Sequence, residues 1–281
     1  MSQTMKLYKI DEPTCISFSG GRTSAYLLHK VLVANDGLPD NAIVCFANTG
    51  KEEEATLKFV RDCEVNWGVK IHWIEYAGNK GYKLVDFDTA SRNGEPFETI
   101  ILEKKYLPNP VTRFCTAQLK IRPMAQYLFD NGFADTKTDA ENCSWIGIRA
   151  DEPRRAAKIQ DKRRIPLFYN GVSAQEVGLF WQQQDFDLML PNFNGRTLHG
   201  NCDLCFLKGG AQVQSLIEEK PERALWWARM ETLVKSSNVQ SHEGTATFRK
   251  DRPSYQQMYN NAINQKVLDF SDESIGCFCG D

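Results

Sequence analysis

The sequence predicts an α/β fold with a doubly wound, mostly parallel, five-stranded sheet of the Rossmann-like kind, followed by a helical, cysteine-bearing subdomain. Three apolar segments of strand length alternate with helical patterns over the first third of the chain, at residues 14–19, 42–47 and 69–76. A glycine-rich turn directly follows the first of these segments. Because parallel strands need crossover connections, this alternation indicates successive right-handed βαβ units.

The individual elements have their own signals in the sequence. The first helix carries apolar residues at helical spacing and stops near Gly37, and the second stops at Gly68. Residues 144–149 and 165–168 are predicted as the fourth and fifth strands. A capping box at residues 173–176 predicts the start of a further helix.

The remaining segments divide the chain into two parts. Residues 77–110 are punctuated by Gly and Pro and predict a long loop with little regular structure, of the length usually seen in lids and substrate loops. The pattern changes near residue 185. Three helices are predicted beyond it, at residues 211–220, 222–234 and 254–267. We therefore expect a sheet domain at residues 1–184 and a helical subdomain at residues 185–281.

Composition limits the classes of partner. The net charge is −2 and the pI is about 6.1, so no overall positive field draws the protein to nucleic acid or to an anionic membrane. No apolar run approaches the roughly 18 residues that span a bilayer, and the start of the chain lacks the apolar core of a secretion signal. We expect a cytoplasmic protein without a membrane partner. Nine cysteines are many for a reducing compartment, so clustered ones predict metal or thiol chemistry.

Residues 19–24, Ser-Gly-Gly-Arg-Thr-Ser, form a turn suited to holding phosphate. Gly20 and Gly21 have no Cβ, so the backbone can bend tightly and aim several N–H groups at one anion. The following helix contributes the positive end of its dipole. Hydroxyl donors and one positive charge can join these amides, from Ser19, Thr23, Ser24 and Arg22. The spelling is neither the Walker lysine loop nor the dinucleotide fingerprint.

A second polar loop, Asn48-Thr49-Gly50, follows the second predicted strand. Ligands of open α/β sheets bind beyond the carboxyl ends of the strands, so we expect both loops to face one pocket. Backbone groups at the end of a strand can pair with an adenine edge. The side chains of Asn48 and Thr49 are suited to a ribose, and a simple turn is the alternative interpretation.

Four motifs, in their order and spacing over roughly residues 14–210, resemble the phosphoadenosine phosphosulfate (PAPS) reductase family of the adenine nucleotide α-hydrolase superfamily, which includes ATP pyrophosphatases. They are Ser-Phe-Ser-Gly-Gly-Arg-Thr-Ser (17–24), Phe-Ala-Asn-Thr-Gly (46–50) with the acids that follow it, Arg-Phe-Cys-Thr (113–116) with Leu-Lys-Ile-Arg-Pro (119–123), and Gly-Ile-Arg (147–149) with Glu152 and Arg155. The resemblance implies a sheet of the HUP type and a nucleotide whose phosphate lies on the first loop. It also implies an adenine near Phe46 and Asn48, beside Thr49 and Gly50.

The chain departs from the commonest family spelling, Ser-Gly-Gly-x-Asp-Ser, at Thr23. The acid that is missing there is often linked to magnesium-bound pyrophosphate. Glu52, Glu53 or Glu54 could supply a carboxylate to magnesium instead. Three adjacent acids at the start of a helix are otherwise favourable partners of its dipole.

Arg149 ends an apolar strand and opens the densest basic stretch of the chain, which runs to residue 164. Arginine presents a rigid fork that grips phosphate or sulfate at two points. The resemblance places an arginine loop here against the outer anion of the substrate, and we predict Arg149 first and Arg155 second as catalytic residues. A solvated run of charges and contact with a nucleic acid backbone are the alternatives.

The cysteines Cys202 and Cys205 stand three residues apart and can chelate one metal ion or cluster, but two thiolates are not enough. In family reductases with an iron–sulfur cluster, a cysteine before a Lys-x-x-Pro stretch meets a later Cys-x-x-Cys, and Cys115 occupies the first place. Cys277 is our choice for the fourth ligand, with Cys279 close by. Four thiolates suit a 4Fe–4S cluster or zinc, for which His199 is a further ligand, and metal-free thiols are a third option.

Two reactions are compatible with the resemblance. One cleaves ATP between the α and β phosphates to adenylate a substrate for sulfur insertion, with a sulfur donor or acceptor protein as partner. The other reduces PAPS or adenosine phosphosulfate (APS) through Cys279, because Cys279-Gly280 is similar to the reactive tail of family reductases that lack the cluster ligands. Relatives often pair as homodimers.

Two interpretations from other classes remain open at this stage. A non-catalytic adenine-nucleotide sensor or DNA-associated adaptor would keep the pocket without turnover, and Thr23 in place of the acid favours it. A zinc-dependent nucleic-acid-binding protein would use the arginine stretch and the Cys-x-x-Cys turn, although the acidic pI argues against it.

Overall fold

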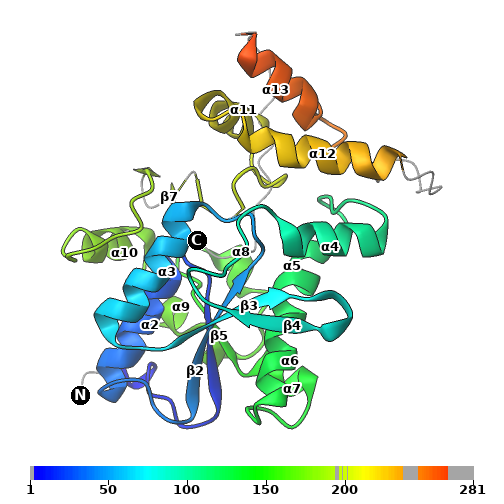
Figure 1. The fold of residues 1–281 in the computed structure, drawn as a ribbon. Coiled ribbons are helices and arrows are strands. Elements are labelled where there is room, and N and C mark those ends of the chain that lie inside the picture. Colours follow the sequence, from blue (N-terminus) through cyan, green and yellow to red (C-terminus); the bar gives the residue numbers. More distant parts are fainter. Residues whose placement is uncertain (1–2, 194–195, 198, 201, 237–245, 265–281) are drawn as a thin grey trace.

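The computed structural model describes residues 3–193, 196–197, 199–200, 202–236 and 246–264, and a five-stranded sheet forms its centre (Figure 1). The strand order is β4-β3-β2-β1-β5, in which only the β3–β4 pair is antiparallel. The strands are β1 (Thr14–Phe18), β2 (Ala42–Asn48), β3 (Ile71–Tyr76), β4 (Tyr82–Val85) and β5 (Ser144–Ile146). The predicted α/β class and the mostly parallel sheet of five strands are confirmed.

Helices surround this sheet and form a separate group beyond it. In the first half of the chain they are α1 (Gln3–Lys6), α2 (Arg22–Asn35), α3 (Glu54–Trp67), α4 (Glu95–Lys104), α5 (Phe114–Thr116), a π-helical segment (Ala117–Ile121) and α6 (Arg122–Asp130). Further along they are α7 (Lys137–Asn142), α8 (Pro153–Ala156), α9 (Pro166–Tyr169), α10 (Ala174–Trp181), α11 (Gly210–Glu219), α12 (Arg223–Ser236) and α13 (Tyr255–Ile263). Short 3-10 turns cover Gly78–Lys80 and Lys162–Arg164, and a small hairpin joins β6 (Asn192–Phe193) to β7 (Arg196–Thr197).

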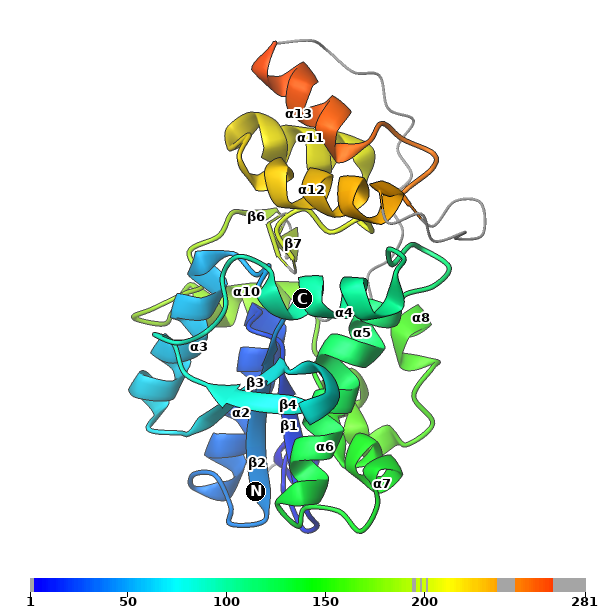
Figure 2. The same ribbon diagram turned by 45° about the vertical axis from the view of Figure 1, so that its right-hand side comes forward.

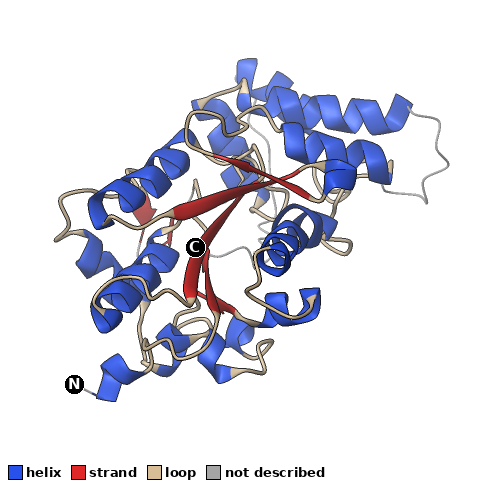
Figure 3. Cartoon of the chain, turned by 60° about the horizontal axis from the view of Figure 1, so that its bottom comes forward, coloured by secondary structure: helices blue, strands red, loops and turns tan. Residues whose placement is uncertain are grey.

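Both faces of the sheet are buried under helices. Figure 1 shows α2 and α3 on one side and α6 and α7 on the other, and Figure 3 shows the strands between these layers. Neighbouring residues of one strand alternate between the two cores: Ile16 packs with the residues of α2 and α3, whereas Cys15 packs with those of α6 and α7. Strands that are covered on both faces read as continuous apolar runs, which explains why β1 and β2 were visible in the sequence.

Several predicted helix boundaries are confirmed. α2 ends where Asp36 adopts a left-handed conformation just before Gly37, and α3 ends at Gly68, which has φ +58°. α10 begins after Ser173, whose side chain accepts a hydrogen bond from the Glu176 amide. Within the described residues, no helix is long and apolar enough to cross a membrane.

The prediction of a fifth strand at residues 165–168 is wrong. This segment forms the short helix α9, which begins at Pro166. Proline has no N–H to donate to a neighbouring strand, and its fixed φ suits the first turn of a helix. The fifth strand of the sheet is β4 instead, which pairs with β3 through the register Trp73↔Val85 to Tyr76↔Tyr82.

The prediction of an irregular loop over residues 77–110 is also wrong, because it contains both β4 and α4. Gly81 has φ +78° and turns the chain back from β3 into β4, so a glycine here marks a tight reversal. α4 has Pro96 in its first turn, acids near its start and Lys104 near its end, which is the charge order that favours a helix. The Gly and Pro residues therefore punctuate regular elements.

The last described helices pack on one another beyond the sheet (Figure 2). α11, α12 and α13 lie close to the predicted helical positions and share an apolar core that contains Trp227, Phe248 and Tyr255. Inside this core, the buried carboxylate of Glu231 accepts hydrogen bonds from the Phe248 amide (3.3 Å) and the Tyr255 amide (3.1 Å). Burial raises the pKa of Glu231. The division of the chain at residue 185 stays a prediction.

We expect Glu231→Ala to lower the free energy of unfolding by about 2–5 kcal/mol, because two buried N–H groups lose their acceptor. Urea denaturation followed by tryptophan fluorescence measures the change. Glu222→Ala is the control, because Glu222 is exposed and pairs only loosely with Lys220, at 3.8 Å. An equal loss in both variants would contradict the assigned role of Glu231.

Candidate functional site

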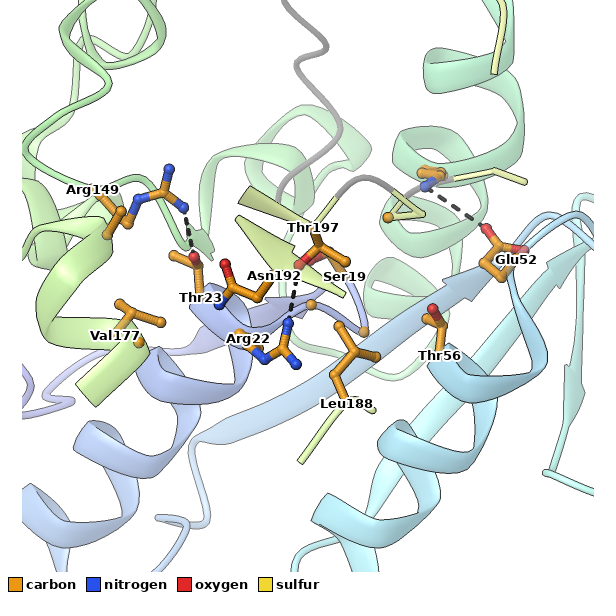
Figure 4. Close-up of a pocket in the computed structure, with 16 residues that line it drawn as sticks. Ser19, Arg22, Thr23, Glu52, Thr56, Arg149, Val177, Leu188, Asn192 and Thr197 are labelled. Carbon is orange, nitrogen blue, oxygen red and sulfur yellow. Dashed lines mark hydrogen bonds and ion pairs between the residues drawn. The ribbon is translucent and has the colours of Figure 1, made fainter. Parts of the chain in front are cut away.

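A pocket opens at the carboxyl edge of the sheet, where β1 and β2 end. It encloses about 600 Å³ of empty space, including solvent at its mouth. Its wall contains the turn after β1 together with residues of α3, α10 and the β6–β7 hairpin (Figure 4). The lining residues are Ser19, Gly20, Gly21, Arg22, Thr23, Glu52, Thr56, Lys120, Arg149, Ala174, Val177, Gly178, Leu188, Asn192, Thr197 and Gly200.

We call the turn at residues 19–24 the anion loop. Its backbone conformation requires a glycine at position 20. Gly20 has φ +76°, and a Cβ placed on it would lie 2.6 Å from Thr56 Cγ2. The Ser24 hydroxyl accepts from the Ser19 amide (3.1 Å) and donates to the Gly21 carbonyl (3.0 Å), which holds the loop closed. α2 starts after Gly21 without a side-chain cap, so its first-turn amides can meet an anion in the pocket.

Arg22, predicted to add a charge for phosphate, holds the wall of the pocket instead. Its guanidinium forms a bidentate pair with Asp187, at 2.7 and 2.5 Å. It also donates to the Leu190 carbonyl (3.0 Å) and to Thr197 Oγ1 (3.2 Å). Arg22 therefore fastens the segment that leads into the β6–β7 hairpin to the anion loop.

Arg149 lies at the anion loop, as predicted, and it is only 6% exposed. Its Nη1 donates to Thr23 Oγ1 at 2.8 Å (Figure 4). Its Nε donates to Asp151 at 3.1 Å. Thr23 thus holds the arginine at the place where the family spelling has an acid. Arg155 does not line this pocket; it pairs with Glu152 at 2.5 Å, and the same Glu152 accepts from the Arg149 amide.

Among the described residues, the side chains that line the pocket carry charges of both signs. They are the cations Arg22, Lys120 and Arg149 and the single carboxylate of Glu52. Glu52 accepts from the Thr49 amide and hydroxyl at 2.9 Å and lies 3.9 Å from Lys120 Nζ. The two neighbouring acids form ion pairs away from the pocket lining: Glu53 with Arg223 and Glu54 with Arg92. Glu52 is therefore the acid that the structure brings to the pocket.

Phe46 and Asn48, which were predicted near adenine, make their side-chain contacts within the protein. Phe46 is fully buried and packs edge-to-face on Trp73, and Asn48 donates to Glu75 (2.6 Å) and to the Ser91 carbonyl (2.9 Å). Neither residue lines the described pocket, nor does Gly50, which approaches Gly94 closely. The placement of the base beside them stays a prediction that depends on backbone groups.

A second cavity, of about 420 Å³, is lined by three of the four predicted metal ligands. Cys115, Cys202 and Cys205 all line it, although Cys115 is distant from the other two in the sequence. Large apolar side chains form most of the remaining wall, from Phe97, Leu119, Phe206, Leu207 and Trp227. Burial and the nearby Glu52 carboxylate raise the pKa of Cys202. We call this space the cysteine cavity.

The three thiols share the cavity without meeting at one point. Within the described ranges, no group of three or more His, Cys, Asp or Glu residues is placed to hold a single metal ion. His199 does not line the cavity, and its Nε2 lies 2.8 Å from Glu219. The proposed fourth ligand Cys277 and the tail residue Cys279 lie outside the described residues.

The turn that carries Cys202 and Cys205 is fastened to the loop between β2 and α3. Glu52 forms an isolated β-bridge with Cys202, and the Asp203 amide donates to the Lys51 carbonyl at 2.7 Å. The Asp203 carboxylate pairs with Lys51 Nζ (3.0 Å) and accepts from Trp227 Nε1 (2.9 Å). The same loop thus borders the pocket through Glu52 and the cysteine cavity through Thr49.

Lys120 was missing from the predicted site residues, and it lines both cavities. It lies in the π-helical segment between α5 and α6. Pro123 cannot donate a hydrogen bond to the carbonyl four residues earlier, which accounts for a widened turn here. The Lys-x-x-Pro pattern was therefore the available signal. Nothing in the local sequence pointed to Asn192 or Thr197, because these residues reach the pocket through tertiary packing.

Comparison with known proteins finds two similar proteins, both of which are uncharacterized. No protein-family model matches the chain. The chain is 28% identical over 295 residues to an uncharacterized nin region protein of Escherichia phage lambda, and the alignment covers 93% of each. It is 31% identical over 172 residues to an uncharacterized protein of Methanocaldococcus jannaschii, covering 57% of this chain and 30% of that protein.

We expect Arg149→Gln to weaken the binding of inorganic pyrophosphate about tenfold to hundredfold, because a charge-assisted hydrogen bond contributes about 1.5–3 kcal/mol. Isothermal titration calorimetry measures the affinity. Arg163→Gln is the matched control, since Arg163 is 63% exposed and pairs with Asp161 and Glu12 at the surface. If both variants bind pyrophosphate equally well, Arg149 is not part of an anion site.

Proposed function

We propose that this protein is an adenine-nucleotide-dependent enzyme of sulfur metabolism, which activates its substrate with ATP beside a cysteine-ligated iron–sulfur cluster. The observation that carries the proposal is the joining of two cavities: the anion loop and the three cysteines face neighbouring spaces that share Lys120. The sequence resemblance to PAPS reductases and the strand order of the sheet support a fold of the HUP nucleotide-binding type.

The anion loop is built for phosphoryl chemistry. In the proposed reaction an oxygen of the acceptor attacks the α-phosphorus of ATP, the bond to the bridging oxygen breaks, and pyrophosphate leaves. Amides at the start of α2 and the Arg149 guanidinium are fixed before the reaction, so they stabilise the developing charge without reorganising. Glu52 is the carboxylate available to magnesium, although its present hydrogen bonds to Thr49 would have to loosen.

The cysteine cavity suits a 4Fe–4S cluster. Cys115, Cys202 and Cys205 would hold three corners, with Cys277 as the proposed fourth ligand. Thiolates are the usual protein ligands of such a cluster, and three cysteines line this one space. When bound, such a cluster supplies redox-active iron and sulfide near the nucleotide. Phe97, Trp227 and their apolar neighbours would exclude water from it.

We expect anaerobically purified protein to be brown, with broad absorption near roughly 400 nm. Cys205→Ser should lose most of this absorption because one of the thiolates is removed. Cys143→Ser serves as the control, since Cys143 packs against the core under α6 and α7 and does not line the cavity. Colourless protein that contains stoichiometric zinc would contradict the cluster.

We expect pyrophosphate release from ATP in the presence of magnesium and an acceptor, measured with α- and γ-labelled nucleotide. Lys120→Met should reduce the rate at least about tenfold, because it removes a charge that faces both cavities. Lys158→Met, on the exposed basic stretch, is the control. Sulfite release from PAPS with a thiol donor, without pyrophosphate release from ATP, would instead assign the sulfonucleotide reductase.

A further inference from the structure

Lys208 is a lysine inside the cysteine turn that the proposed function does not yet use. Its Nζ donates to the backbone carbonyls of Cys202 (2.9 Å) and Asp203 (2.8 Å). The Lys208 amide in turn donates to the Cys205 carbonyl at 3.0 Å. The side chain of Lys208 thus holds the end of the turn that carries Cys202, and its backbone amide holds the end that carries Cys205.

The charge of Lys208 has no carboxylate partner of its own. Within the described part of the chain, no carboxylate forms an ion pair with its Nζ. The nearest acid along the sequence, Asp203, is already committed through both of its oxygens, to Lys51 on one side and to Trp227 on the other. Glu53, the other acid in this neighbourhood, pairs with Arg223.

Lys208 is half-buried, and a cation that is shielded from water is costly unless an anion compensates its charge. Two neutral carbonyls satisfy hydrogen bonds of the ammonium group but do not cancel its charge. The sulfur atoms that would carry negative charge as cluster ligands beside the turn are those of Cys202 and Cys205, which face the cysteine cavity. The apolar wall of that cavity lowers the local dielectric, so charges interact more strongly across it than in water.

We propose that Lys208 is the resident counter-ion of the Cys-x-x-Cys turn, a positioning residue whose positive charge stabilises the anionic thiolate-bound group in the cysteine cavity. The inference rests on the proposed function, because it takes the occupant to be an iron–sulfur cluster. A fixed positive charge close to a cluster favours the addition of an electron. Lys208 therefore sets the reduction potential in addition to the shape of the turn.

The test is an anaerobic redox titration of the full-length protein, followed by its visible absorption. Lys208→Met should make reduction about tenfold less favourable, which lowers the midpoint potential by about 59 mV for a one-electron couple. Lys208→Arg keeps the charge and should hold the potential near that of the unmodified protein. Lys220→Met removes an exposed lysine that pairs with Glu222 at 3.8 Å, and it should cause no shift.

Each outcome decides something different. A cluster in Lys208→Met with an unchanged potential overturns the counter-ion role alone, and so does a shift of equal size in Lys208→Arg. Unmodified protein that assembles no cluster overturns the proposed function and this inference with it. Thermal unfolding of all variants shows whether Lys208→Met still folds. If it does not, Lys208→Gln, which also removes the charge but keeps a hydrogen-bond donor, takes its place in the redox titration.

Discussion

The docking of the cysteine turn onto the loop after β2 is the interaction on which the proposed site depends. The bridge between Glu52 and Cys202, together with the buried pair of Lys51 and Asp203, joins residues that are about 150 positions apart in the chain. Without this contact the anion loop and the cysteines would belong to separate parts of the protein. The Asp203 amide also donates to the Lys51 carbonyl, so backbone and side-chain bonds together specify one docked arrangement.

The cations near the pocket are held by acids, and this changes how the site can work. Arg22 forms a bidentate pair with Asp187, and Arg149 is oriented by Asp151 and Thr23. An incoming phosphate therefore meets side chains that are already fixed, which lowers the entropy lost on binding. It must also compete with the carboxylates that fix them. The backbone amides at the start of α2 carry no side-chain cap, so a phosphate can bind them without displacing a carboxylate.

Sequence reasoning located the anion loop, because a strand, a Ser-Gly-Gly turn and a helix follow one another within a few residues. It also brought Cys115 together with Cys202 and Cys205, although only through the family resemblance. It failed where a proline or a glycine is compatible with two different structures. Pro166 marked the start of a helix instead of the end of a strand, and the glycines near residue 81 marked a strand reversal instead of a loop.

The pocket residues supplied by tertiary packing were beyond reach for a different reason. Leu188 and Thr197 come from a segment with no periodic pattern, and Arg22 draws that segment onto the loop from more than 160 positions away. Likewise, Asn48 looks like a ligand group in the sequence, and its commitment to Glu75 appears only once β2 and β3 are paired. Long-range partners of this kind leave no trace in local spacing.

The central claim is that the amides and cations around the anion loop bind the phosphates of an adenine nucleotide. Calorimetric titration of anaerobically purified protein with a non-hydrolysable ATP analogue, in the presence of magnesium, tests it most directly. The account predicts saturable binding of one nucleotide per chain that fails when Gly20→Val distorts the loop in a protein that otherwise stays folded. No binding heat from the ATP analogue, PAPS or APS would contradict it.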